Sequence, residues 1–109
     1  MTCRELADVV EQLSLPTGSE EGFKWGDPQA ELTGCLVCWM ATMDAIADAA
    51  AQGCNMIVCH ESLTFPYSHI SPGLENYTTW TVNRRRLTAL SKHDLCVYQS
   101  RSCSSPARG

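Results

Sequence analysis

Apolar residues near the start of the chain recur with a helical period. Between positions 6 and 13 they fall at spacings of three and four, which places them on one face of a helix. Thr2 stands three residues before Glu5, a pairing in which each side chain caps the other residue's backbone N–H. The pattern predicts an amphipathic helix over about residues 3–13. The stretch that follows, up to Glu31, is rich in glycine and proline and predicts a long loop.

Three short apolar runs come next, with amphipathic segments between them. The runs at 32–40 and 55–59 are almost continuously apolar, which is typical of strands buried on both faces. Between them, Thr42 is suited to cap a helix and Gly53 to end it. A third helix then precedes a third strand at 95–98. This alternation predicts the α/β class, with βαβ units and a mostly parallel sheet flanked by helices.

The chain of 109 residues has the length of one domain. We assign residues 1–98 to this α/β domain. Residues 99–109 are expected to form a disordered tail, because no apolar periodicity remains there. The core is expected to have three layers, with helices covering adjacent strands. Its predicted strand residues are Leu36, Val37, Ile57, Val58 and Val97, and its predicted helix residues are Leu6, Val9, Ile46, Ala50 and Leu87.

Composition and charge narrow the classes of function. The formal net charge is −4, the wrong sign for a protein that binds nucleic acid by neutralising phosphates. No run approaches the ~18 apolar residues of a membrane span, and the acidic start is unlike a signal peptide. We therefore expect a cytoplasmic protein with neither nucleic acid nor membrane as a partner. Acidic residues gather in the first half and basic ones in the second, which favours solvated faces of opposite sign over contact between subunits.

The seven cysteines are odd in number and come without a secretory context, which argues against a disulfide scaffold. Cys35 and Cys38 have the spacing of a redox or zinc motif. On a strand, however, residues three apart face opposite sides, so we interpret both as core residues. A nucleophilic Cys59 with His60 as its base is disfavoured, because a side chain rarely reaches back to its neighbour and no orienting acid is identifiable.

Other residues with potential chemistry are better explained as surface positions. His69 and His93 stand in polar loop contexts. The three successive arginines at 84–86 spread around a helix, which favours a solvated face over a clamp for a phosphate-bearing ligand.

The segment that begins at His60 leaves the carboxyl end of the second predicted strand, where open α/β sheets place their ligands. His60 and Glu61 are its first two residues, and both side chains are able to bind metal. Neighbours in an extended chain point to opposite sides, so this pair would more naturally serve two metal ions than chelate one. From spacing alone, a surface His–Glu pair remains the alternative to a ligand pair.

Several segments, taken in order, resemble one family of dinuclear-metal proteins. The sequence FKWGDP at 23–28, followed by ELTG at 31–34, resembles the family's "GDP…evtG" loop. The residues WMAT at 39–42 lead into the helix after the first strand, and NMIVCHE at 55–61 resembles the family's "nLIitHEPtF" segment. The chain is thus similar to the Nif-three-like family, often described as type 2 GTP cyclohydrolase I, over about residues 6–98.

The resemblance implies the N-terminal half of a Nif-three-like fold, in which His60 and Glu61 are metal ligands. It also implies divalent metal ions as cofactors (zinc, manganese or iron), a metal-dependent hydrolase acting on a small-molecule substrate, and a ring-shaped homo-oligomer. Ser62 replaces the family's usual proline, and Arg101 falls near the place of a further metal-binding His. Complete members add a His and a Glu from a later segment. We therefore expect a truncated member with an incomplete dinuclear site, and the alternative is a non-catalytic remnant or interaction subunit.

Overall fold

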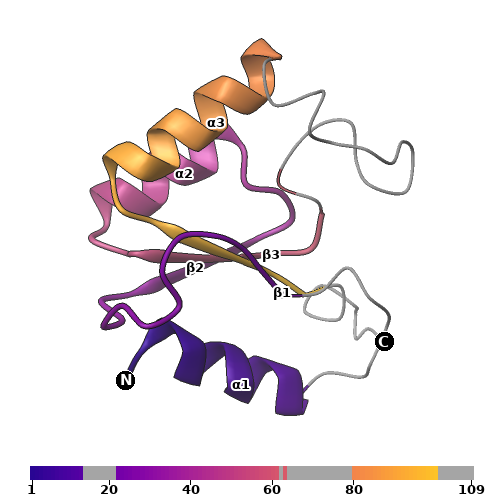
Figure 1. Ribbon diagram of the computed structural model, residues 1–109, viewed down its shortest axis with the longest axis vertical. Helices are drawn as coiled ribbons and strands as arrows, with labels where there is room; N and C mark the ends of the chain where they lie inside the picture. The colour runs from indigo at the N-terminus through magenta and orange to yellow at the C-terminus, as the bar shows by residue number, and fades with distance from the viewer. Residues whose placement is uncertain (14–21, 62, 64–79, 101–109) are drawn as a thin grey trace.

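The computed structural model describes residues 1–13, 22–61, 63 and 80–100. One helix lies against one face of a sheet, and two helices lie against the other (Figure 1). This arrangement confirms the predicted α/β class and the three layers. The elements in chain order are α1 (Cys3–Leu13), β1 (Gly22–Trp25), β2 (Cys35–Cys38), α2 (Met43–Ala51), β3 (Met56–Cys59), α3 (Thr81–Lys92) and β4 (Cys96–Gln99).

The four described strands form one sheet in the order β1-β4-β3-β2. β2, β3 and β4 run parallel to one another, whereas β1 is antiparallel to β4. The predicted mostly parallel sheet is therefore confirmed. Because parallel strands end at the same edge, the residues that follow β2, β3 and β4 meet at one edge of the sheet, and His60 is the first residue after β3.

The predicted N-terminal helix is confirmed as α1, together with its reciprocal cap. The N–H of Thr2 donates to Oε1 of Glu5 at 2.7 Å, and the N–H of Glu5 donates to Oγ1 of Thr2 at 3.1 Å. The fully buried residues Cys3 and Ala7 turn toward the sheet. The buried cluster on this face comprises Cys3, Ala7, Met56, Val58, Cys96 and Tyr98.

The helix predicted after the first strand is α2, and it begins and ends as expected. Oγ1 of Thr42 accepts from the N–H of Ala45 at 3.1 Å. Gly53 follows the helix with a φ of +77°, a conformation that favours glycine. α2 and α3 cover the second face of the sheet (Figure 1). The buried cluster there comprises Ala41, Ile46, Ala49, Ile57, Cys59, Leu63, Leu90, Leu95 and Val97.

Strand β1 lies inside the span that the sequence predicted to be a loop, so that prediction is wrong for residues 22–25. The ring of Phe23 meets the ring of Tyr98 edge-on, with centroids 5.1 Å apart. This contact joins β1 to the α1-side core. The glycines at 22 and 26 have φ values of +132° and +93°, and they bend the chain at the two ends of this short strand.

Two of the predicted core residues are exposed. Val37 and Val58 are cross-strand neighbours, as predicted, but Val37 is 64% exposed whereas Val58 is 2% exposed. The difference arises because β2 is the last described strand on its side of the sheet. Val9, on α1, is also 41% exposed. By contrast, Ile46, Ile57 and Val97 are buried as expected.

The ordered domain extends past the boundary that the sequence suggested. β4 includes Gln99, and the N–H of Ser100 donates to the carbonyl of Cys59 at 2.8 Å. Both residues are 1% exposed, so the predicted tail does not begin at Gln99. The remainder of that prediction, residues 101–109, lies outside the described residues.

Candidate functional site

The structure brings His60 and Glu61 together immediately after β3. Nδ1 of His60 lies 3.7 Å from Oε2 of Glu61, so the expectation that the two side chains point apart is wrong. The backbone supplies the reason. The N–H groups of both residues donate to one carbonyl, that of Trp39, at 3.1 and 2.9 Å, and two donors on one acceptor require the chain to bend out of its extended form.

Trp39 also holds the imidazole ring of His60. The two rings are stacked, with centroids 4.2 Å apart and planes 21° apart. The side chains of His60 and Glu61 are only 15% and 21% exposed, whereas Trp39 is 56% exposed. A ring packed against an indole has few orientations open to it, so His60 is presented to the edge of the sheet in a defined direction.

The end of β4 supports the same segment from the side. Gln99 pairs with Cys59 in the parallel register, and its Nε2 donates to the carbonyl of His60 at 3.2 Å. Sequence analysis placed Gln99 in the tail and so missed this role. The pairing of β3 with β4 positions Gln99 beside this segment, and no local pattern in the sequence predicts that contact.

Arg86 reaches the site from α3. Its Nη1 donates to the carbonyl of Leu63 at 2.8 Å, and its Nη2 lies 3.7 Å from Sδ of Met40. Arg86 is only 8% exposed, so the expectation of a solvated face is wrong for this arginine and right for Arg84 and Arg85, which are exposed. One signal was available: Leu90, which is buried, stands four positions after Arg86 in the same helix, and that spacing puts both on one face.

An imidazole nitrogen and a carboxylate oxygen are ligands that suit zinc, manganese or iron. Two atoms 3.7 Å apart are both able to reach one ion at about 2.1 Å, so His60 and Glu61 fit a shared ion. In the part of the chain that the structure describes, no group of three or more His, Cys, Asp or Glu side chains is arranged as a metal site. The described residues therefore offer a pair of ligands.

The cysteines next to this site belong to the core. Cys59 is fully buried, and its Sγ lies 3.4 Å from the carbonyl oxygen of Glu61, which agrees with the view that it is not a nucleophile. Cys35 and Cys38 pack into the clusters on opposite faces of the sheet, as their spacing predicted. Burial is the main cause that raises the pKa of the Cys35 thiol to about 11, so it is a poor thiolate at neutral pH.

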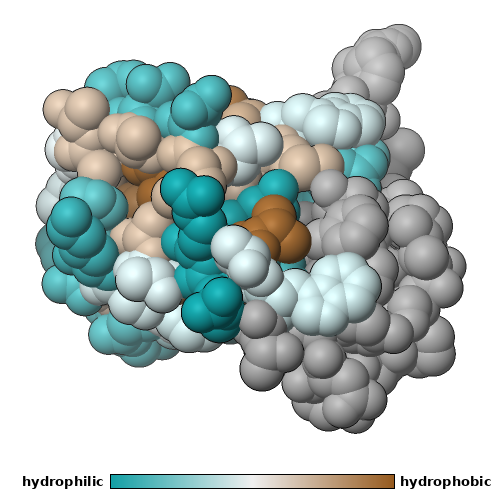
Figure 2. Space-filling model, turned by 90° about the horizontal axis from the view of Figure 1, so that it is seen from above, coloured by the Kyte–Doolittle hydropathy of each residue, from teal (hydrophilic) through white to brown (hydrophobic). Residues whose placement is uncertain are grey.

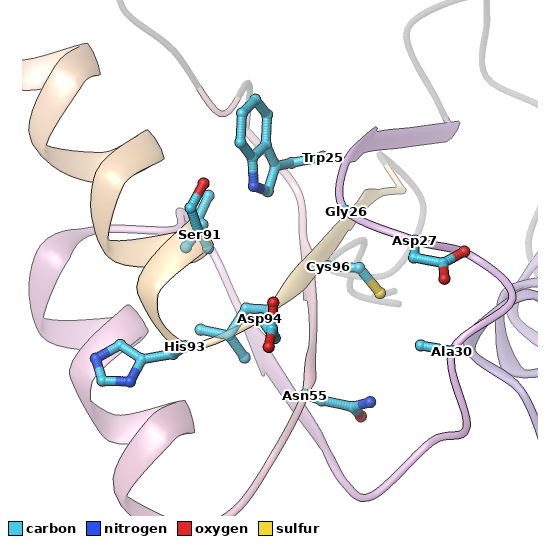
Figure 3. Close-up of a pocket in the computed structure, with 11 residues that line it drawn as sticks. Trp25, Gly26, Asp27, Ala30, Asn55, Ser91, His93, Asp94 and Cys96 are labelled. Carbon is cyan, nitrogen blue, oxygen red and sulfur yellow. The ribbon is translucent and has the colours of Figure 1, made fainter.

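A cavity of about 600 Å³ lies at the opposite end of the sheet, where β3 and β4 begin (Figure 3). Polar groups of Asp27, Asn55 and Asp94 line it, with the indole of Trp25 as one wall. His93 belongs to the same lining but is an exposed residue, as expected. Neither proposed metal ligand lines this cavity. His69 lies outside the described residues.

The fold and the site define an α/β protein with a His–Glu pair at the carboxyl edge of a mostly parallel sheet. Residues 1–100 match the Duf34/NIF3 (NGG1p interacting factor 3) family, and the chain belongs to that family. This confirms the resemblance found in the sequence. None of the described helices is both long and apolar enough to cross a membrane.

Solved structures of low sequence identity share the fold. Protein SA1388 of Staphylococcus aureus has a TM-score of 0.69 and 20% identity, with 91% of this chain and 28% of that chain covered. Reduced HcgD from Methanocaldococcus jannaschii has a TM-score of 0.73 and 18% identity, with 92% and 39% covered. A Bacillus cereus protein related to NIF3 has a TM-score of 0.68 and 17% identity, with 91% and 27% covered.

The chain thus spans between about a quarter and two fifths of the length of these structures. At such identities the likeness shows the fold alone. No curated protein sequence matches the chain significantly.

Proposed function

We propose that this chain binds a divalent metal ion through Nδ1 of His60 and Oε2 of Glu61. The observation that carries the proposal is their 3.7 Å separation at the carboxyl edge of the sheet, the edge at which α/β proteins place ligands. The low exposure of both side chains supports it, because partial burial strengthens their attraction for a cation. Membership of the NIF3 family agrees with this reading.

When bound, a zinc, manganese or iron ion would supply Lewis-acid activation of water for hydrolysis of a small molecule. His60 and Glu61 would hold such an ion, and Trp39, Gln99 and Arg86 position the residues around this pair. A catalytic site usually takes three or more protein ligands. We therefore expect weak, exchangeable binding and little hydrolysis, including hydrolysis of the GTP cyclohydrolase type, by this chain alone. A dinuclear centre would need additional ligands, either from a further segment of polypeptide or from other copies of this chain in a homo-oligomer.

Calorimetric titration with Mn²⁺ tests the proposal. Manganese is the better probe because thiolates select zinc, and the seven cysteines of this chain would compete for it. Wild-type protein is expected to bind, whereas His60→Ala is expected to abolish binding and Glu61→Gln to weaken it. The matched control is His93→Ala, which removes an exposed histidine and is expected to change nothing.

Binding that survives His60→Ala would place the metal elsewhere. Absence of Mn²⁺ binding by the wild-type chain would instead favour the second candidate, an interaction subunit without a metal. We also propose a cytoplasmic location, because disulfides are rare in that compartment and none of the six cysteines among the described residues is in a disulfide.

A further inference from the structure

The cavity at the amino ends of β3 and β4 is separate from the proposed metal site. Its volume of about 600 Å³ lies within the range of roughly 300–1,000 Å³ in which proteins bind small molecules. Its most deeply buried lining residues, Leu90, Leu95 and Cys96, are at most 2% exposed, and we call these three residues the base. The last turn of α3 and the segment that follows β1 form two of its walls (Figure 3). The cavity therefore has the size of a small-molecule site and an apolar base.

Asp94, in the wall at the end of α3, stands where an acidic residue is disfavoured. The N–H of Leu95 donates to the carbonyl of Leu90 at 3.0 Å, and the N–H of Asp94 donates to that of Ser91 at 3.3 Å, which is the Schellman pattern of a helix end. Asp94 takes the left-handed position of this motif, with a φ of +51°, where glycine or asparagine is usual. The last carbonyls of a helix also carry partial negative charge. Position 94 therefore holds a negative charge at a cost in stability, and that charge lines the cavity (Figure 3).

Asp27 adds a second carboxylate, from the segment that follows β1. Its Oδ1 accepts from the N–H of Gln29 at 2.9 Å, which holds the side chain in place. Within the described part of the chain, Oδ2 of Asp27 and the carboxylate of Asp94 make no hydrogen bond or ion pair. Asn55 also lines the cavity, but its amide is engaged by the backbone of residues 31–33 at 2.8 and 2.9 Å. The groups left to contact a ligand are therefore mainly the two carboxylates.

The lining of the cavity carries little positive charge. Apart from the exposed His93, no basic side chain is among the described residues that line it. Arg85 and Lys92, in the second half of α3, line a separate groove on the face over α2 and α3, where hydrophilic side chains separate the apolar ones that are visible (Figure 2). Trp25 contributes its indole as a wall of the cavity (Figure 3), and the face of an indole attracts cations. The carboxylates and the indole together suit a positively charged ligand.

An organic cation fits this lining better than a metal ion does. In the part of the chain that the structure describes, no group of three or more His, Cys, Asp or Glu side chains is arranged to hold a metal. Hard metal ions also need several oxygen ligands, whereas the indole of Trp25 offers none. An ammonium ion with an alkyl chain uses both parts of the lining, because carboxylates accept its N–H groups and apolar surface contacts its methylene groups.

From these features we infer that the cavity binds a linear aliphatic diamine, with its ammonium groups at Asp27 and Asp94 and its alkyl chain against the indole of Trp25 and the base. The two carboxylates belong to different walls, so each receives one end of the ligand. The alkyl chain displaces water from the base, which favours binding. Both aspartates are exposed, so solvent screens the ion pairs and the dissociation constant is expected between about 0.1 and 1 mM. This site shares no residue with the metal site.

Nuclear magnetic resonance of the ¹⁵N-labelled protein tests the inference. The probes are α,ω-diaminoalkanes of four to eight carbons, and the neutral controls are the diols of the same lengths. The amides of residues 25–30 and 90–96 are expected to shift saturably with at least one diamine, whereas those of residues 35–38 stay in place. The diols are expected to cause no saturable shift, because they lack the charge that the carboxylates recognise.

Two conservative variants assign the binding to the carboxylates. Asp94→Asn is expected to raise the dissociation constant about threefold, as for one exposed ion pair, and it should fold at least as well because asparagine accepts a positive φ. Asp27→Asn keeps an oxygen that accepts from Gln29, and the double variant is expected to bind about tenfold more weakly. The matched control is Asp48→Asn, at an exposed aspartate of α2 outside the cavity, which is expected to bind like wild type.

Several results would overturn the inference. They are the absence of shifts at these amides with every diamine up to about 10 mM, equal shifts with the diols, and wild-type affinity in the double variant. A tighter response of the same amides to Ca²⁺ than to any diamine would also overturn it, because the cavity would then be a metal site. The test is independent of the metal proposal, since the double variant keeps His60 and Glu61 and should bind Mn²⁺ like wild type.

Discussion

The indole of Trp39 lies stacked on the imidazole of His60, with ring centroids 4.2 Å apart. The carbonyl of Trp39 accepts from the N–H groups of His60 and Glu61 at 3.1 and 2.9 Å. One residue at the end of β2 therefore sets both the ring orientation and the backbone bend of the pair that follows β3. Parallel pairing of β2 with β3 makes this possible, because it ends both strands at the same edge.

Replacing Trp39 should weaken metal binding even though Trp39 is not a ligand. Trp39→Ala removes the surface against which the imidazole is stacked, so ordering His60 on binding costs more. We expect the Mn²⁺ affinity to fall about tenfold, as for other residues that orient metal ligands. Trp39→Phe, which keeps an aromatic surface, should recover most of the affinity. Equal affinity in Trp39→Ala and wild type would show that the stack does not position His60.

Arg86 should contribute far more to the free energy of unfolding than the arginine that precedes it, Arg85. Arg86→Ala removes the 2.8 Å hydrogen bond to the carbonyl of Leu63 and leaves a buried acceptor beside a void. Hydrogen bonds to charged groups contribute about 1.5–3 kcal/mol, so we expect a loss of about 2 kcal/mol in the free energy of unfolding by urea. The exposed Arg85 provides the control, since Arg85→Ala should change stability by less than about 0.5 kcal/mol. Similar losses in both variants would contradict a structural role for Arg86.

The fold could be predicted from the sequence wherever local signals, such as helix caps and apolar runs, agree with the burial seen in the structure. Thr2 and Thr42 cap their helices as expected, and the apolar runs became the three parallel strands. Strand β1 was missed because its glycines indicate a loop, whereas its pairing with β4 depends on a contact between Phe23 and Tyr98, far apart in the chain. Val37 was expected in the core because the pattern identifies an apolar strand but not its place at the edge of the sheet.

The site was accessible only in part. His60 and Glu61 were identified as a pair from their place after a strand and from family resemblance, but their mutual orientation depends on the carbonyl of Trp39. Gln99 and Arg86 take their roles from strand pairing and helix packing, which join residues that are 39 and 23 positions apart. The contact of Gln99 leaves no periodic signal in the sequence, whereas the helical spacing of Arg86 and Leu90 indicates only that the two share a face and not what Arg86 contacts.

The half-buried thiol of Cys35 and the buried thiol of Cys96 should make the protein sensitive to alkali. Burial is the main cause that raises the pKa of Cys35 from 9.0 to about 11, and it raises the pKa of Cys96 as well. The thiols lose their protons at a lower pH in the unfolded chain than in the folded one. Their contribution to the free energy of unfolding is therefore fully present below pH 9.0 and is lost as the pH rises through about 11. Urea unfolding at about pH 8 and about pH 10 should show this loss. Cys35→Ala should show a shallower decline, and an unchanged slope would exclude Cys35 as a source of the loss.

Gly26 should tolerate alanine less well than Gly53, although both residues have positive φ angles. Their values are +93° and +77°, so a side chain at either position carries a conformational cost of about 1–2 kcal/mol. A Cβ on Gly53 would meet nothing within 4 Å, whereas a Cβ on Gly26 would lie 2.5 Å from Cβ of Cys96 and 2.6 Å from its Cα. Backbone atoms of β4 cannot move aside cheaply, and overpacking of this kind adds about 1–3 kcal/mol.

We therefore expect Gly53→Ala to lower the free energy of unfolding by about 1 kcal/mol and Gly26→Ala to lower it by at least about twice as much. Urea unfolding of the two variants measures the difference, and equal losses would mean that β1 and β4 separate at this point without cost.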